Sequence, residues 1–274
     1  MTINCKGTLI DFDTPKVMGV LNITPDSFYD GGKYQSEKSV LVQTEKMLKE
    51  GATFIDIGAY SSRPGADPVS EEEELKRIVP VVELLVKEFP EAYFSIDTFR
   101  AKVAENTIEV GATIINDISG GNLDEQMFET VAKLQVPYIL MHMQGTPQTM
   151  QDNPNYSNVT TDLIKFFSRK VNQLHKLQIN DVILDVGFGF GKTIEHNFQL
   201  LKDLELFQTL NSPILAGLSR KSMLYKTLDI SAQEALNATT SANTIALLNG
   251  ANILRVHDVK EAVECVKIFG MVKN

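Results

Sequence analysis

The sequence predicts a single-domain α/β protein, a (β/α)8 TIM barrel spanning residues 1–274. Eight short apolar runs alternate with eight segments of helical periodicity, which is the element order of such a barrel. The runs are almost continuously apolar, as is typical of strands buried on both faces of a parallel sheet. No change of composition and no linker divides the chain, so a doubly wound open sheet is the weaker alternative.

The eight apolar runs are the expected strands of the barrel. Most of them end in a polar residue or a glycine-rich turn, where a strand gives way to a loop. Residues 3–12 precede the first run and are expected to form a short strand or hairpin at the bottom of the barrel. The expected strands are 17–23, 53–59, 93–97, 113–119, 137–143, 182–188, 213–219 and 251–257.

Helical periodicity predicts the segments between the strands. Ser70 followed by Glu73 has the spacing of a capping box and marks the start of one helix. Residues 71–74 are all acidic, and we expect them to form a solvated first turn that the helix dipole favours. The other expected helices are Glu37–Glu50, Arg100–Val110, Asp124–Leu134, Val159–Leu177, His196–Leu206, Ala232–Leu248 and Val259–Phe269.

Charge and cysteine content exclude several classes of function. A net charge of −9 and a pI near 5.0 argue against nucleic acid or an anionic membrane as the main partner. Cys5 and Cys265 lack metal-ligand spacing and indicate reduced thiols rather than a disulfide framework. Residues 1–16 lack the apolar core of a signal peptide, and no apolar run reaches the length of a membrane span. We therefore expect a cytoplasmic protein that acts on small molecules.

The stretch ILDVGFGFGK at 183–192 looks like a phosphate-binding loop at first sight. A P-loop would need glycine at Val186, and the dinucleotide fingerprint would need glycine at Lys192, so both templates fail. The residues alone leave two interpretations, a flexible turn after a buried strand or a loop shaped around a ligand.

Polar side chains lie at the ends of nearly all the expected strands. The carboxyl ends of the strands carry the active site in barrels of this kind, so these side chains should meet at one rim. One buried acid is often structural, whereas a ring of polar groups indicates a functional site. We expect Asp56 and Asp117 to be structural, while His142 could belong to the core or the site. The strand-end residues are Asn22, Asp56, Asp97, Asn116, Asp117, His142, Asp185, Ser219, Arg220, Lys221, Arg255 and His257.

These strand-end residues and the loops beside them offer two chemistries. Asp97, Asn116 and Asp185 can exchange hydrogen bonds with a flat heterocycle rich in N–H groups. Donors suited to an anion form the second set, which consists of Arg63, Lys221, Arg255 and His257. The pairing predicts a substrate with a nitrogen heterocycle at one end and phosphate at the other. The long loops 24–34 and 61–69 could close over such a substrate and exclude water.

Eight short motifs, read in order, span nearly the whole chain. They are LNITPDSFYDGG (21–32), DIGAYSSRPGA (56–66), SIDT (95–98), INDISGG (115–121), MHMQGTPQTMQ (141–151), DVGFGFGK (185–192), LSRKS (218–222) and RVHDV (255–259). As a set they resemble the signatures of the dihydropteroate synthase family. That family is a (β/α)8 barrel, usually a homodimer, which condenses a 6-hydroxymethyl-dihydropterin diphosphate with 4-aminobenzoate. The products are dihydropteroate, a folate precursor, and diphosphate.

The resemblance also implies roles for individual residues. The pterin would be held by Asp97, Asn116, Met141, Asp185, Phe190 and Lys221. The diphosphate would be held by Arg63, Arg255 and His257, and its magnesium ion by Asn22. The 4-aminobenzoate site would be shaped by Ser62, Pro64, Phe190 and Ser219. The implied catalytic residues are Arg63, Asp97, Lys221, Arg255 and His257.

The glycine stretch is interpreted, through this resemblance, as a pterin-site loop. Asp185 would accept two hydrogen bonds from the amino-pyrimidinone edge of the pterin. Gly187 and Gly189 would let the backbone turn where a Cβ would obstruct a planar ligand. Phe190 would offer the ligand an apolar face, and Lys192 is expected at the surface.

The chain departs from the family's usual motifs at three positions. Tyr60 stands where members commonly have glutamate, Ser62 where they have threonine, and Val186 where they have proline. Two other functions are considered, a methyl-folate-dependent methyltransferase domain and a non-catalytic pterin-binding paralogue. Both alternatives are disfavoured by the predicted anion-binding residues, which are Arg63, Lys221, Arg255 and His257.

Overall fold

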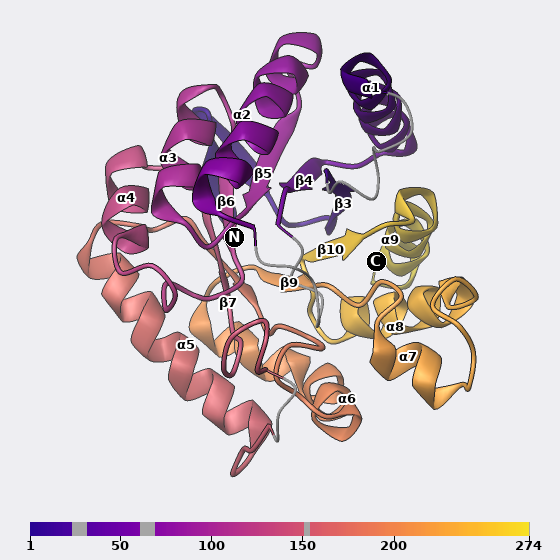
Figure 1. Ribbon diagram of the computed structural model, residues 1–274. Helices are drawn as coiled ribbons and strands as arrows, with labels where there is room; N and C mark the ends of the chain where they lie inside the picture. Colours follow the sequence, from indigo (N-terminus) through magenta and orange to yellow (C-terminus); the bar gives the residue numbers. More distant parts are fainter. Residues whose placement is uncertain (24–31, 61–68, 151–153, 274) are drawn as a thin grey trace.

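The computed structural model is an eight-stranded parallel barrel surrounded by helices (Figure 1). It describes residues 1–23, 32–60, 69–150 and 154–273. The barrel closes in the order β10-β3-β4-β5-β6-β7-β8-β9, and each expected strand is confirmed. The strands are β3 (Lys16–Asn22), β4 (Phe54–Gly58), β5 (Tyr93–Asp97), β6 (Ile114–Asp117), β7 (Tyr138–Met141), β8 (Val182–Asp185), β9 (Ile214–Ala216) and β10 (Ile253–Val256).

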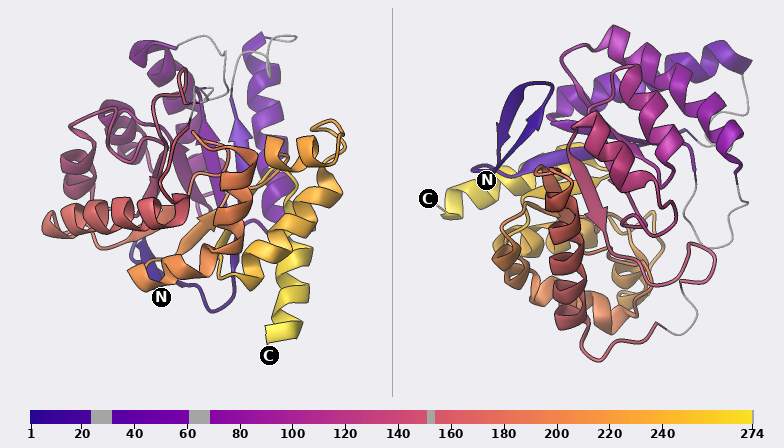
Figure 2. Two further views of the ribbon diagram at one scale, coloured as in Figure 1. Left: turned by 90° about the horizontal axis from the view of Figure 1, so that it is seen from below. Right: turned by 90° about the vertical axis from the view of Figure 1, so that its left-hand side faces the viewer.

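Helices pack round the outside of the barrel, where they cover its outward-facing apolar side chains (Figures 1 and 2). Among the described residues, none of them is both long enough and apolar enough to cross a membrane. The helices are α1 (Gly32–Glu50), α2 (Glu71–Glu88), α3 (Ala101–Glu109), α4 (Met127–Leu134), α5 (Val159–Lys176), α6 (Ile194–Lys202), α7 (Ser222–Thr227), α8 (Leu236–Leu248) and α9 (Val259–Lys273).

Two helical segments differ from the sequence prediction. The helix expected at His196–Leu206 is divided, because α6 ends at Lys202 and a 3-10 helix covers Leu204–Leu210. The short helix α7 was not predicted, since six residues are too few to display a helical period.

The start of α2 confirms one expectation and corrects another. Ser70 Oγ accepts from the Glu73 backbone N–H at 3.2 Å, so the Ser70 half of the predicted capping box is present, while the Glu73 side chain accepts from Arg77 Nε. The prediction that residues 71–74 are all solvated was wrong for Glu74, which is fully buried. Glu74 lies on the same helix face as Ile78 and Val82, forms an ion pair with Arg100 and accepts from the Thr98 hydroxyl at 2.7 Å.

The expected N-terminal hairpin is confirmed and closes the bottom of the barrel (Figure 2, indigo). It consists of β1 (Thr2–Cys5) and β2 (Thr8–Asp11), which pair antiparallel. Ile3, Ile10 and Phe12 join one buried cluster with side chains inside the barrel. Those barrel residues are Met18, Phe54, Ile114, Ile139, Ile183, Leu215 and Ile253.

The strand register brings polar strand ends into one layer at the opposite end. Asn22 pairs with Gly58, Gly58 with Asp97, and Asp97 with Asn116. Further round the barrel, Met141 of β7 pairs with Asp185 of the neighbouring β8. This layer is the rim at which the sequence places the functional site.

Candidate functional site

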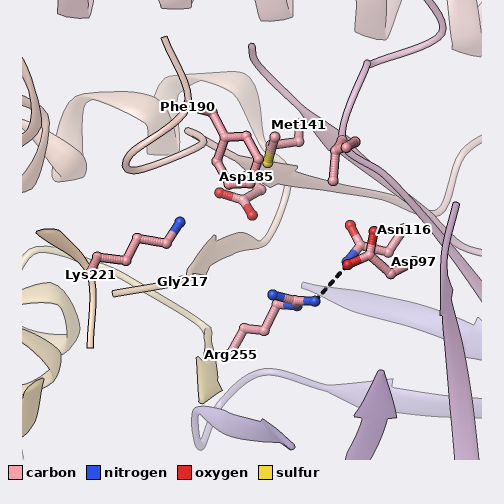
Figure 3. A pocket seen from close by; sticks show the side chains of 9 residues that line it. Asp97, Asn116, Met141, Asp185, Phe190, Gly217, Lys221 and Arg255 are labelled. Atoms are coloured by element: carbon pink, nitrogen blue, oxygen red, sulfur yellow. Dashed lines mark hydrogen bonds and ion pairs between the residues drawn. The ribbon is translucent and has the colours of Figure 1, made fainter. Parts of the chain in front are cut away.

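A pocket opens among the strand ends, and Figure 3 shows the side chains that line it. All six residues predicted to hold the heterocycle meet there, together with Arg255. Ile118 and Gly217 also line the pocket, but an apolar residue and a glycine gave no signal in the sequence. The lining residues are Asp97, Asn116, Ile118, Met141, Asp185, Phe190, Gly217, Lys221 and Arg255.

On one side of the pocket, Arg255 joins two carboxylates from neighbouring strands. Its Nη2 lies 2.6 Å from Asp56 Oδ2 and 2.8 Å from Asp97 Oδ2, and its Nε donates to Asp56 Oδ2 at 2.7 Å. Figure 3 shows the guanidinium group reaching Asp97 across the pocket. Asp56 is fully buried and therefore acts as a fixed anchor for Arg255, in agreement with the structural role expected of it.

Asn116 presents a defined edge to the pocket. Its Nδ2 donates to Asp56 Oδ2 at 2.9 Å, which fixes the orientation of the amide. Its Oδ1 is buried and has no hydrogen-bond partner among the described residues. A buried acceptor without a partner is costly, so this oxygen suits a ligand N–H group.

Asp185 and Lys221 face each other on the other side of the pocket (Figure 3). Asp185 Oδ1 accepts from the Gly187 N–H at 2.7 Å. Lys221 Nζ donates to the Phe188 carbonyl and lies 4.7 Å from the centroid of the Phe190 ring. The pocket thus places an acid and an ammonium group beside an aromatic wall.

Burial shifts the pKa of three ionisable groups in the pocket. It raises the pKa of Asp97 to about 7, although Arg255 acts to lower it. It also raises the pKa of Asp185, against the opposing charge of Lys221. It lowers the pKa of Lys221 to about 8, against the charge of Asp185. Such perturbed groups converging on one cavity are typical of a functional site.

The turn predicted at Gly187 and Gly189 is present, since both have positive φ, but the protein's own backbone is an obstacle at Gly187 and also at Gly191. A Cβ on Gly187 would lie 2.1 Å from the His142 carbonyl oxygen, and Gly187 has a φ of +66°. A Cβ on Gly191 would lie 2.8 Å from the Gln144 carbonyl oxygen at a φ of +60°. The obstacle is therefore the backbone of the loop after β7 rather than the ligand alone.

Lys192 is buried, so its predicted place at the surface was wrong. The residue is only 4% exposed, and its Nζ lies 2.9 Å from the carbonyl oxygens of Gly187 and Phe190. His142, which could have served core or site, is buried beside it. The spacing of the sequence carried no signal for this contact, because the acceptors are backbone atoms brought together by the loop.

Three further predicted residues, Ser219, His257 and Asn22, lie at the rim. Ser219 Oγ is 3.0 Å from His257 Nδ1 and also accepts from the His257 backbone N–H at 3.2 Å. The side chain of Asn22 is exposed at the end of β3. Ser62, Arg63 and Pro64 lie outside the described residues, as does most of the long loops 24–34 and 61–69. Within the described part of the chain, His, Cys, Asp and Glu form no cluster of three that could hold a metal ion.

Known proteins resemble this chain along its whole length. The family model described as "Pterin binding enzyme" matches residues 18–257. Haemophilus influenzae dihydropteroate synthase is 44% identical over 276 residues, which cover 100% of each chain. The chain belongs to the dihydropteroate synthase family.

Solved dihydropteroate synthases share the fold of this chain. The Yersinia pestis enzyme, in complex with a sulfonamide drug, is 43% identical with a TM-score of 0.92, covering 100% of this chain and 99% of that one. The Xanthomonas albilineans enzyme, with 4-aminobenzoic acid, is 35% identical with a TM-score of 0.92, covering 99% and 98%. The family resemblance seen in the motifs is confirmed.

Two departures from dihydropteroate synthase motifs have a structural explanation. Tyr60 packs edge-on against Phe99 at 5.2 Å between ring centroids, lies under the Arg100 guanidinium and accepts from Gln148 Nε2 at 3.1 Å. In place of a carboxylate, this tyrosine joins the ends of β4 and β5 to the loop after β7. Val186 is fully buried and serves the core.

Proposed function

We propose that this chain makes 7,8-dihydropteroate from (7,8-dihydropterin-6-yl)methyl diphosphate and 4-aminobenzoate in folate biosynthesis. The observation that carries this proposal is the pocket itself. It gathers Asp97, Asn116 and Asp185 as hydrogen-bonding groups for a heterocycle, with Lys221 and Arg255 as cations. Relatives named dihydropteroate synthase at similar length support the reaction.

The pterin is proposed to lie between the two sides of the pocket. Asp185 would accept from its amino-pyrimidinone edge, and the partnerless Oδ1 of Asn116 would accept a ring N–H. Met141 and Phe190 would contact the faces of the ring, which their positions in the pocket allow. Lys221, held over Phe190, would donate to a ring acceptor.

The reaction breaks the C–O bond between the pterin methylene and the diphosphate. The electron pair leaves with the diphosphate, and the electron-rich ring shares the positive charge that remains. An ionised Asp97 would stabilise that charge. Arg63, Arg255 and His257 are proposed to receive the developing negative charge of the diphosphate.

Magnesium is proposed to accompany the diphosphate at Asn22. The Asn22 Oδ1 and Asp97 Oδ2 both lie 3.7 Å from the position that a Cβ on Gly58 would take, so the amide oxygen is at the pocket rim. One amide oxygen fits an ion that is usually bound through substrate phosphates, few protein ligands and water. When bound, Mg²⁺ would neutralise charge on the leaving diphosphate.

The 4-aminobenzoate is proposed to bind near Phe190 and Ser219, with Ser62 and Pro64 completing its site. Its aromatic amine attacks the methylene carbon, forms the N–C bond and releases a proton. The amine is already a neutral nucleophile, so no side chain is assigned as a base.

A homodimer in the cytoplasm is proposed, as the family resemblance implies. Helices α8 and α9 pack together and expose apolar side chains that a second copy could cover. These side chains are Ile245, Leu248, Ile268, Met271 and Val272. Light scattering of the purified chain tests this expectation by its mass.

Product analysis with the purified chain tests the function. With both substrates and Mg²⁺, we expect equal amounts of dihydropteroate and diphosphate. Pterin binding without product would indicate a non-catalytic paralogue. Methyl transfer from a methyl-folate, without diphosphate release, would indicate the methyltransferase alternative.

A further inference from the structure

The loop after β8 is held by hydrogen bonds from several directions. The Phe190 N–H donates to the Gly187 carbonyl at 3.1 Å, which closes a four-residue turn. Asn197 Oδ1 accepts from the Gly189 N–H at 2.7 Å, and the Tyr156 hydroxyl donates to the Gly191 carbonyl at 2.7 Å. These bonds leave two carbonyl groups of the turn, those of Gly187 and Phe190, directed toward one point.

Lys192 places its ammonium group at that point. Nζ lies 2.9 Å from each of those two carbonyl oxygens, 3.2 Å from the His142 carbonyl oxygen and 3.2 Å from His142 Nδ1. Burial and the charge of Lys192 lower the pKa of His142 to about 2, so this ring is neutral and its Nδ1 can accept. One cation therefore joins the loops after β7 and β8.

An ammonium group at this depth is costly to bury unless acceptors replace its water. Burial lowers the pKa of Lys192 to about 7, while Asp185 opposes that change. The converging carbonyl dipoles offset the cost only in the observed conformation of the turn. The cation and the turn conformation thus stabilise each other.

The turn fixed by Lys192 forms part of the pocket. Phe190 lines the pocket, and the Gly187 N–H donates to Asp185. Lys192 is not among the described residues that line the pocket, and its ammonium group bonds to the loop backbone instead. We propose that Lys192 is a positioning residue that holds the turn at residues 187–190 so that Phe190 and Asp185 can receive the pterin.

The inference rests on the proposed function only in naming a pterin as the ligand. Lys192 also has an electrostatic effect that does not depend on the turn. Its charge favours the ionised form of Asp185. Loss of the ammonium group should therefore loosen the turn and weaken the hydrogen bonds that Asp185 makes to the ligand.

Amide hydrogen exchange measured by NMR tests the mechanical part without any ligand. In Lys192→Met, which keeps a side chain of similar length but removes the charge, we expect the Gly187 and Phe190 amides to exchange at least tenfold faster. Amides of β5 should keep their rates. Tyr156→Phe is the matched control, because it removes a single bond to the same loop, and the Gly187 and Phe190 rates should change less than threefold. Unchanged rates in Lys192→Met would overturn the proposal.

Ligand binding tests the positioning part. We expect Lys192→Met to weaken pterin binding at least tenfold while the affinity for inorganic diphosphate, whose proposed site includes neither Phe190 nor Asp185, changes less than threefold. Lys192→Arg, which restores a cation and donors, should recover at least half of the loss on a logarithmic scale. A general loss of stability would lower both affinities together, and Lys192→Arg would not restore them. Either result contradicts the proposal.

Should Lys192→Met fail to fold, the unaltered protein carries the test. Protection of the Gly187 and Phe190 amides, corrected for base catalysis, should fall at least tenfold relative to β5 between pH 6 and pH 9. His142 stays neutral over this range, and Asp185 faces Lys192 from β8. Lys221 also titrates here, so the comparison is repeated in Lys221→Gln. Equal protection at both pH values overturns the proposal, whereas a chain that binds no pterin refutes the proposed function alone.

Discussion

Asp97 and Asp185 end two non-adjacent strands of the same barrel, and different cations face them. Arg255 bonds directly to Asp97 and anchors on Asp56, whereas Lys221 faces Asp185 and bonds to the Phe188 carbonyl. Asp97 is thus already held in an ion pair, while Asp185 keeps an oxygen that the Gly187 N–H does not engage. We expect Asp185 to contribute more directly to pterin recognition.

Asp185→Ala should weaken pterin binding by two or more orders of magnitude. Hydrogen bonds to a charged group contribute about 1.5–3 kcal/mol each, and the carboxylate is expected to make two. Calorimetry measures the affinity. Asp117→Asn is the control, because this buried carboxylate bonds to Ser119, Gly121 and Tyr138 instead of lining the pocket. It should lower Tm and change pterin affinity less than threefold, and unchanged affinity in Asp185→Ala would remove Asp185 from the site.

Arg255→Gln should lower the free energy of unfolding by about 3 kcal/mol at pH 8, because it leaves the buried Asp56 and the partly buried Asp97 without their cation. The folded pKa of Asp97, about 7, exceeds the ordinary 3.8, so its stabilising contribution is present at low pH and is lost as pH rises through about 7. Without Arg255 the pKa of Asp97 is higher still, so this stabilising contribution goes on falling above pH 7. The difference in unfolding free energy between Arg255→Gln and the unaltered protein should therefore be smaller at pH 5 than at pH 8. Urea unfolding at the two pH values measures it.

The control for that substitution is Arg220→Gln. Arg220 pairs with Asp258 through Nε and Nη2 at 2.9 and 3.0 Å, at a more exposed site. We expect a loss of about 1 kcal/mol with no difference between pH 5 and pH 8. A deficit of Arg255→Gln that is the same at both pH values would show that Asp97 does not depend on Arg255.

The sequence predicted which residues line the pocket better than it predicted the contacts that surround them. Strand-end position and hydrogen-bonding capacity selected Asp97, Asn116 and Asp185, and all three line one pocket. The burial of Lys192 could not be predicted, because its partners are carbonyl groups that any residue carries. The same holds for the anchoring of Arg255 on Asp56, since 199 positions separate the two residues and only barrel closure brings them together.

At the scale of elements, one helix start was predicted by local chemistry, and the helical segments were predicted by their periodicity. The Ser70 cap was found because its partner is three residues away. Glu74 was misjudged because its burial depends on Arg100 and Thr98, which belong to the next strand–helix connection. The tight helix at Leu204–Leu210 and the short α7 lack the length over which a period can be recognised.

Ser70→Ala tests the importance of the α2 cap. Removing the Oγ acceptor of the Glu73 N–H should lower the free energy of unfolding by about 1 kcal/mol. Ser241→Ala, in the exposed middle of α8, removes a hydroxyl that caps no helix end and should change stability by less than about 0.5 kcal/mol. Equal effects of the two substitutions would show that the cap does not stabilise α2.

At the scale of the whole molecule, the barrel separates stability from function along its axis. The hairpin and the lower strand residues form one buried cluster, and the pocket lies at the opposite, carboxyl end. The barrel could be predicted from the sequence because alternating runs and helical segments in this number admit few other architectures. The order of closure then followed from the chain, since each strand pairs with the next.

Ile3→Ala tests that separation. Ile3 is almost fully buried beneath the barrel, so its truncation should cost about 2–5 kcal/mol of unfolding free energy. Pterin affinity, measured under conditions where the variant is folded, should stay within twofold. Leu9→Ala is the control on the same hairpin, because Leu9 is 70% exposed and should cost little. A large change in pterin affinity in Ile3→Ala would contradict the separation.

The central claim is that the pocket bounded by Asp97, Asn116, Asp185 and Lys221 receives the pterin. A crystal structure of the chain with a bound pterin tests it most directly. We predict the amino-pyrimidinone edge within hydrogen-bond distance of Asp185 and Asn116, with the ring between Met141 and Phe190. A pterin bound outside this pocket, or bound there without contact to Asp185, would contradict the claim.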